Sequence, residues 1–447
     1  MTNGTNRRTF LKGAGAALGG LALPKMVSAK SADKRYIVDL KSASKGVLDG
    51  LNVVHDLSQI DLAVVEADEA QAQGKAFSKD VEMKFDFAAA EDDGNGDEPG
   101  PRKLSQLQWD KQSQGISQVH GQTRGEGTRV AVLDSGAIPH HPDLKNALNT
   151  DLSRNFTGDG GDFTPWYNEH GTHVAGIIAG DDTNDEGVVG TAPGTELVAL
   201  RVFIGPFAFF GDIIAAMTYA GDIESDVANM SLGTYPMPDD ESTRDLKKSI
   251  ERVADYAASQ GTLMVAAAGN DGTNLDTDGD VLSLPNEAEN VMSVGATGPV
   301  GYRWDDKGNG KFVRNYRAAF NKLDEAPTDP APYTNYGSEA IDVSAPGGNY
   351  DTEAKGGDGN WQYDMVLSTV FEWGDDGSTV PDYGWKSGTS MAAPQVTAAA
   401  ALVKSQNPDA TPAEVREHLE STARDVGQAK YHGEGHLDIE AAVNESI

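Results

Sequence analysis

The chain has 447 residues, enough for two domains or for one large domain with processed ends. Its 69 Asp and Glu residues against 36 Lys and Arg give a formal net charge of −33, which argues against nucleic acid and anionic membranes as partners because their phosphates and acidic headgroups would repel it. Cysteine is absent, so disulfides, thiolate zinc sites, iron–sulfur clusters and a cysteine nucleophile are excluded as well.

The N-terminus carries an export pattern. Residues 6–12 read Asn-Arg-Arg-Thr-Phe-Leu-Lys, and a weakly apolar run of 11 residues (13–23) and Val-Ser-Ala (27–29) follow. Paired arginines before such a run are typical of a twin-arginine signal, whereas a membrane span needs about 20 apolar residues. We therefore expect residues 1–29 to be a twin-arginine export signal. We also expect a secreted protein without a membrane span.

Residues 30–101 form a segment with its own pattern. Strand-like alternation occurs at 35–41 and 81–87, and 62–72 is compatible with a strand followed by a helix. An acidic stretch rich in Gly and Pro, 91–101, reads as a linker. These features predict a small α+β unit on a flexible hinge, which could be a prodomain or a permanent accessory domain.

The surplus of carboxylates is compatible with a high-salt environment. At molar salt the Debye length falls to about 3 Å, so dense surface carboxylates repel one another little. We interpret the composition as adaptation to a saline exterior, with ordinary acidity in a low-salt medium as the alternative.

Two motifs place an acid and a base near the start of the larger region. Residues 129–136 read Arg-Val-Ala-Val-Leu-Asp-Ser-Gly, a short apolar strand that ends in Asp134, where open α/β sheets carry functional residues. Residues 168–180 contain His170 and His173 before a run of small and apolar residues, which predicts a buried helix with His170 near its start. Two His at this spacing could bind metal, but there is neither an HExxH pattern nor a cysteine to complete a site. We expect no catalytic metal.

A third motif supplies a nucleophile and identifies the family. Residues 387–396 place Ser390 at a strand-to-helix turn, where unpaired amides of the helix can stabilise an oxyanion. Val-Leu-Asp-Ser-Gly (132–136), His-Gly-Thr-His-Val-Ala-Gly (170–176) and Gly-Thr-Ser-Met-Ala-Ala-Pro (388–394) together resemble the active-site signatures of the subtilisin-like serine proteases, in subtilisin's order of Asp, His and Ser. With its acidity, the chain most resembles the secreted halolysin-like subtilases of halophilic archaea.

The resemblance, which spans about residues 106–443, implies the fold and the roles of the site residues. It implies an α/β domain of three layers, with a mainly parallel sheet and helices on both faces. His170 would take the proton of Ser390, and Asp134 would orient and stabilise the imidazole. In Ala-Ala-Ala-Gly-Asn (266–270), Asn270 would donate its amide to the oxyanion beside the Ser390 backbone N–H.

The resemblance also implies a substrate cleft with small, uncharged walls. Residues 229–233 match the strand that pairs with extended substrates, and the pocket for the residue before the scissile bond (P1) would admit a bulky apolar side chain. Its residues would be Ser231, Leu232, Gly233, Ala268, Gly269 and Ser283. Relatives suggest a cis bond before Pro285.

A structural calcium ion is expected at the acidic loop 181–188. Calcium prefers carboxylate, carboxamide and main-chain oxygens, and relatives bind it at this position. The side-chain ligands would be Asp143, Asn184 and Asp110, and the main-chain ligands Asp182, Glu186 and Val188. Residues 274–280 and 305–310 are weaker candidates, and a merely solvated acidic loop is the alternative.

Together these features predict a secreted zymogen. Residues 30–101 would be a prodomain that assists folding, inhibits the cleft and is cut off near 97–105, leaving 102–447 as a monomeric catalytic domain acting on proteins or peptides. A broad degradative protease is favoured over a processor of one exported precursor. A catalytically dead binding protein would need a broken triad, and the triad is intact.

Overall fold

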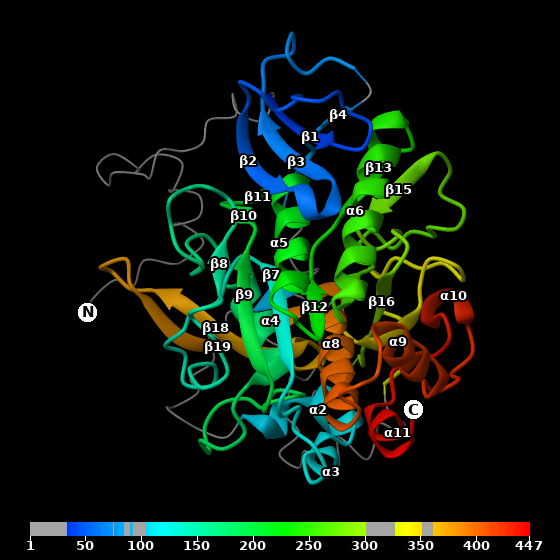
Figure 1. Cartoon of the computed structure of the whole chain (residues 1–447). Coiled ribbons are helices and arrows are strands. Elements are labelled where there is room, and N and C mark those ends of the chain that lie inside the picture. Colours follow the sequence, from blue (N-terminus) through cyan, green and yellow to red (C-terminus); the bar gives the residue numbers. More distant parts are fainter. Residues whose placement is uncertain (1–33, 75, 85–89, 93–103, 301–326, 351–360) are drawn as a thin grey trace.

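The computed structural model describes residues 34–74, 76–84, 90–92, 104–300, 327–350 and 361–447. At its centre lies a seven-stranded sheet in which all neighbouring strands are parallel. From edge to edge these strands are β17 (Val343–Pro346), β16 (Val291–Thr297), β14 (Leu263–Ala267), β12 (Val227–Met230), β7 (Arg129–Asp134), β9 (Glu196–Arg201) and β8 (Arg154–Asn155). Helices lie on both sides of the sheet (Figure 1), which confirms the expected three-layer α/β domain.

Successive residues of the central strands pack against opposite helical layers. In β7, Val130 and Val132 belong to one core, and Ala131 and Leu133 belong to the other. This is the two-residue period of a strand that is buried on both faces. The first core includes residues of α4 (His170–Ala179), α8 (Thr389–Gln406) and α9 (Pro412–Ser421), and the second includes residues of α5 (Phe210–Asp222) and α6 (Glu241–Ser259).

A smaller antiparallel sheet covers α5 and α6 (Figure 1). Its order is β2 (Asn52–Leu57), β3 (Leu62–Glu66), β1 (Arg35–Asp39) and β4 (Phe77–Lys79). Ile37, Leu57 and Val64 extend the second core of the larger domain. The strands expected near 35–41 and at the start of 62–72 are therefore confirmed.

The helix expected after that last strand is absent. Residues 69–71 form a turn, in which the carbonyl of Asp68 accepts from the amides of Gln71 and Ala72. So short a segment before Gly74, whose φ is +101°, gains too few hydrogen bonds to offset helix nucleation. Residues 34–74 and 76–84 contain strands and the 3-10 turn Ser58–Ile60 but no α-helix, so the expectation of an α+β unit was wrong for this part of the chain.

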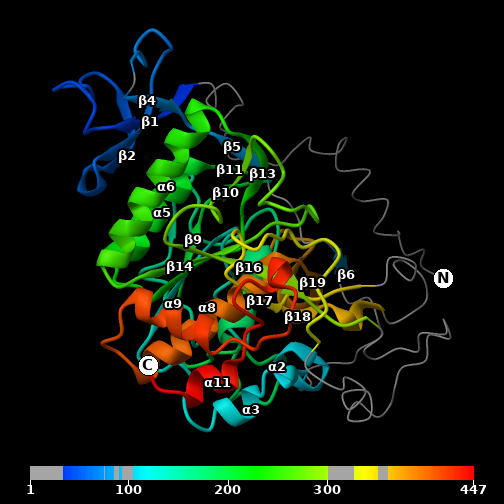
Figure 2. The ribbon, with the colours of Figure 1, turned by 90° about the vertical axis from the view of Figure 1, so that its right-hand side faces the viewer.

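Two short strands connect the small unit to the larger domain. β5 (Glu82–Lys84), within the strand expected at 81–87, pairs antiparallel with β11 (Phe207–Phe209), and β11 pairs with β10 (Phe203–Ile204). β6 (Ala90–Asp92) pairs antiparallel with the end of β19 (Thr379–Ser387), which itself pairs with β18 (Val366–Trp373). Figure 2 shows β5 among β10, β11 and β13 (Thr234–Pro238), and β6 beside β19.

Some sequence expectations lie outside the described residues. The export signal at 1–29, most of the linker and the calcium candidate at 305–310 are among them. Within the described residues, no helix combines the length and apolar character that crossing a bilayer requires.

Candidate active site

Asp134 and His170 meet at the carboxyl edge of the central sheet. Asp134 ends β7, His170 begins α4, and both are buried. His170 Nδ1 lies 2.9 Å from Asp134 Oδ1 and 3.0 Å from Oδ2, so the imidazole donates to the carboxylate. The Ser135 amide also donates to Oδ1 over 2.6 Å, which fixes the carboxylate at the end of the strand.

Gly171 allows the helix to approach the strand so closely. A Cβ at this position would lie 2.3 Å from the carbonyl oxygen of Gly136 and 3.0 Å from Cβ of Asp134. Real Cβ atoms do not approach backbone atoms to 2.3 Å, so any larger residue would push the start of α4 away from β7. The glycine after His170 is therefore a steric requirement of the Asp–His pair.

The second histidine of the motif has a structural environment. His173 is buried in α4, and its Nε2 lies 3.2 Å from the carbonyl oxygens of both Val366 and Gly384. Burial, together with the nearby charge of Lys386, holds the pKa of His173 well below its usual value. His173 thus joins α4 to the β18–β19 hairpin as a neutral donor.

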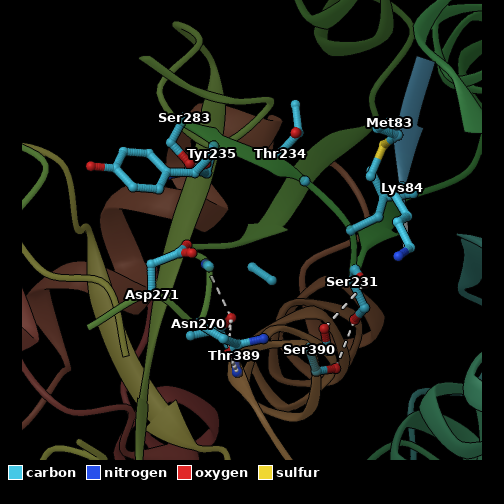
Figure 3. A pocket seen from close by; sticks show the side chains of 15 residues that line it. Met83, Lys84, Ser231, Thr234, Tyr235, Asn270, Asp271, Ser283, Thr389 and Ser390 are labelled. Atoms are coloured by element: carbon cyan, nitrogen blue, oxygen red, sulfur yellow. Dashed lines mark hydrogen bonds between the residues drawn. The ribbon is translucent and has the colours of Figure 1, made fainter. Parts of the chain in front are cut away.

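Ser390 lies at the start of α8, and Ser231, just beyond β12, holds it there. Pro394 is the sixth residue of α8, and its missing N–H leaves the Ser390 carbonyl without the helical donor four residues on. The Ser231 hydroxyl donates to that carbonyl over 2.7 Å. The Ser390 hydroxyl donates in turn to the Ser231 carbonyl over 3.2 Å, as Figure 3 shows.

Asn270 is oriented by the residue that precedes Ser390. Its side-chain oxygen accepts from the amide of Thr389 over 2.9 Å and from the Thr389 hydroxyl over 3.0 Å (Figure 3). Since the amide oxygen is held in this way, the NH2 end of Asn270 is the end available to an oxyanion formed beside Ser390. Both residues line the same cavity.

That cavity, of about 480 Å³, contains most of the expected P1 pocket. Ser231, Leu232, Gly233, Gly269 and Ser283 line it as expected. Ala268 does not; it is fully buried beneath the surface, and Ala267 forms this part of the wall. The lining residues that the sequence did not predict are polar or come from the N-terminal unit, namely Met83, Lys84, Thr234, Tyr235, Asp271, Asn286 and Thr389. The expected cis bond before Pro285 is present.

The acidic loop 181–188 brings together part of the expected ligand set. Asp143 is fully buried, and its carboxylate accepts from the side-chain amide of Asn184 (2.7 Å) and the main-chain amide of Val188 (2.9 Å). Burial raises the pKa of Asp143, and the partners that the structure gives it, which include the Tyr383 hydroxyl, are neutral. A buried carboxylate with neutral partners is costly, and a cation bound by oxygens there would compensate its charge.

Other expected ligands have different partners. The Asp182 side chain pairs with Arg124 and His120, and Glu186 is exposed, so only their main-chain oxygens remain candidates. Asp110 does not join this loop. Its carboxylate accepts from Gln395 of α8 over 2.8 Å and lies 3.2 Å from Lys111 Nζ, so its selection as a ligand was wrong.

The weaker calcium candidate at 274–280 includes a carboxylate with several donors. The Asp276 carboxylate accepts hydrogen bonds from the main-chain amides of residues 338–340, and the Asn274 side-chain oxygen accepts one from the Asp276 amide. These hydrogen bonds fix one loop against another, so the Asp276 carboxylate has a structural role without a bound ion.

Comparisons with known proteins agree with this geometry. The model of the Subtilase family matches residues 125–437. Subtilisin BL of the bacterium Lederbergia lenta is 34% identical over 321 residues, which cover 71% of this chain and 91% of that protein. A protease structure from Pseudoalteromonas arctica has a TM-score of 0.59 at 29% identity, covering 77% of this chain and 98% of that one.

A further solved structure supports the fold alone. The epidermin leader peptide processing serine protease of Staphylococcus aureus has a TM-score of 0.68 at 21% identity and covers 93% of this chain and 98% of its own. With the family match and the bacterial relatives, the conclusion is direct: the chain belongs to the subtilase family and is a subtilisin-like serine endopeptidase.

Proposed function

We propose that Asp134, His170 and Ser390 form the catalytic triad of this endopeptidase, and the buried Asp134–His170 pair is the observation that carries the proposal. The Ser390 oxygen attacks the peptide carbonyl while His170 Nε2 takes its proton. His170 then gives that proton to the departing amine, and water hydrolyses the acyl-enzyme by the same route. Asn270 and the Ser390 amide stabilise the oxyanion.

Fluorophosphonate labelling tests this assignment, because the reagent needs an activated serine. The protein is refolded in molar salt with calcium, and the adduct is mapped by mass spectrometry. We expect one adduct on Ser390 that is absent in Ser390→Ala. A folded, fully processed protein that takes no label would refute the assignment.

We propose that the protein is made as a zymogen whose N-terminal segment, residues 30–101, assists folding, inhibits the cleft and is cut off near residues 97–105. Lys84 lines the cavity that contains Ser390, and Ala90 pairs with Ser387 three residues before the nucleophile. These contacts of the N-terminal segment beside the nucleophile support its inhibitory role. The mature N-terminus found by mass spectrometry after refolding tests the position of the cut, and an N-terminus outside 97–105 would contradict it.

We propose a structural calcium ion held by Asp143 and Asn184 together with main-chain oxygens of Asp182, Glu186 and Val188. The buried charge of Asp143 supports it. An ion bound only by the folded state raises its stability by mass action, so EDTA should lower the melting temperature. Asp143→Ala should remove that response. An unchanged melting temperature in EDTA would count against the site.

We propose that the protein is secreted by the twin-arginine pathway and adapted to high salt, as the halolysin-like subtilases of halophilic archaea are. The paired arginines at 7–8 and the net charge of −33 support this proposal. Replacing both arginines by Lys should leave the precursor inside the cell, while the wild-type control reaches the medium. Equal export of the variant and the wild type would refute the pathway.

We propose a broad protease of protein and peptide substrates that acts as a monomer. Digestion of a peptide library in high salt should give scattered cuts, whereas a processor of one precursor would cut at a single motif.

A further inference from the structure

The floor of the substrate cavity is polar and buried. Ser283, in β15 (Val281–Leu284), and Asn286, in the turn that follows, both line the cavity, and their exposed fractions are 2% and 3%. The Ser283 hydroxyl donates to the Asn286 side-chain oxygen over 2.7 Å. The hydroxyl therefore fixes the carboxamide of Asn286 in one orientation.

The other end of that carboxamide lacks a partner. Among the described residues, Nδ2 of Asn286 is a buried donor with no hydrogen-bond acceptor. An unpaired buried donor is unfavourable, and proteins rarely keep one unless a ligand or water satisfies it. Because Asn286 lines the cavity where a substrate side chain would lie, the substrate is the natural source of an acceptor.

The rest of the cavity restricts the acceptor that would fit. Leu232, Gly233 and Gly269 in the lining are small or apolar, which suits the methylene groups of a side chain that ends in an acceptor. Two carboxylates lie close by: Asp271 lines the cavity, and Glu287 accepts from the Ser283 amide behind the floor. Lys84 also lines the cavity but belongs to the segment that maturation removes. In the mature protein a negatively charged side chain would therefore be repelled here, whereas a neutral one with an oxygen at its end would not.

We propose that Asn286, oriented by Ser283, determines P1 specificity by donating its side-chain N–H to a neutral acceptor, and that glutamine is the residue it accepts best. This inference rests on the proposed peptidase function. The sequence predicts a P1 pocket with small, uncharged walls that admits a bulky apolar side chain, and this inference adds a hydrogen-bonding floor that favours a polar one.

Two substrates that differ only at P1 test the proposal. Glutamine and methionine have similar length and flexibility, so two otherwise identical fluorogenic peptides isolate the amide group. The matured protein, its N-terminus verified by mass, is compared with Asn286→Ala. In the wild type kcat/KM for the glutamine peptide should equal or exceed that for methionine, and in Asn286→Ala their ratio should fall about tenfold, the usual effect of losing one buried hydrogen bond.

Two further variants make the result specific. Asn286→Asp keeps the size and shape of the side chain but lacks the N–H donor. It should therefore lower the glutamine-to-methionine ratio of kcat/KM as well, and it covers the case in which Asn286→Ala packs poorly. Asn444→Ala, an exposed position near the C-terminus, should leave both rates unchanged.

The outcomes separate the two proposals. The role of Asn286 would be overturned if the wild type preferred methionine and the glutamine-to-methionine ratio of kcat/KM stayed within twofold in both Asn286 variants. The peptidase function would still stand. A folded, processed wild-type protein that hydrolyses neither peptide nor casein would overturn the peptidase function, and this inference with it.

Discussion

Replacing Gly171 by alanine should abolish most activity at a modest cost in stability. The added Cβ would lie 2.3 Å from the Gly136 carbonyl oxygen, so the start of α4 must move by about 1 Å to restore ordinary contact. That movement separates His170 Nδ1 from Asp134 Oδ1, which lie 2.9 Å apart in the unchanged protein. A misplacement of this size costs about 100-fold in rate, while overpacking costs about 1–3 kcal/mol of folding free energy.

The assay measures activity and stability on the same sample. Because a weakened variant would not process itself, tagged precursor is matured by added wild-type protein, which is then removed. Peptide hydrolysis gives kcat/KM, and calorimetry gives the melting temperature.

A glycine five residues further along α4 provides the control. At Gly176 a Cβ would lie 2.2 Å from the Thr369 hydroxyl oxygen, a similar clash on the side that faces β18. Gly176→Ala should therefore lose stability to a similar extent but keep its kcat. If both variants lost activity equally, or if Gly171→Ala remained fully active, the steric account of the Asp–His pair would be refuted.

Three other perturbations have defined outcomes. Asn270→Ala should lower kcat with little change in KM, by the roughly 10²–10³-fold that loss of this donor costs subtilisin, and a change in KM alone would contradict its role. The Asp80 carboxylate accepts a hydrogen bond from the Gly211 amide. Its burial raises the pKa of Asp80 to about 6, although the positive charge of Arg35 acts to lower it. In the Ser390→Ala precursor, the folded state thus holds the carboxyl proton of Asp80 more tightly than the unfolded chain does. The melting temperature of this precursor should therefore fall as pH rises from 4 to 7, and adding Asp80→Asn should flatten that slope. Dilute buffer should lower the melting temperature of the mature protein through carboxylate repulsion, and an unchanged curve would exclude salt adaptation.

The sequence predicted the parts of the site whose requirements are local. A strand that ends in Asp134, a helix that begins at His170 and a turn before Ser390 each lie within one short segment. Parallel strands bring their carboxyl ends to one edge, so the three segments converge once the sheet forms. Gly171 is part of the same local logic, because its neighbours force the close approach.

The errors involve partners that are distant in sequence. Asp110 has the chemistry of a calcium ligand, but nothing near it in the chain indicates that Gln395 lies beside it. Ala268 follows the strand that forms the wall, and the three-dimensional course of the chain shows that Ala267 reaches the cavity whereas Ala268 does not. Asn286 has an obvious role only when its bond to Ser283 and its unpaired nitrogen are seen together.

Gln395 is a polar residue whose position in the sequence indicates a buried contact. In a helix of buried alanines, a glutamine implies a buried polar partner, because an unpaired amide there would be costly. The structure supplies Lys111, 284 positions away, whose ammonium donates to Gln395 over 2.8 Å and to Thr191 over 2.9 Å. Burial lowers the pKa of Lys111, while Asp110 pulls it up. This cluster joins α2 (Trp109–Ser113) to the helix that carries Ser390, so the sequence anomaly indicates a long-range contact although it cannot identify the partner.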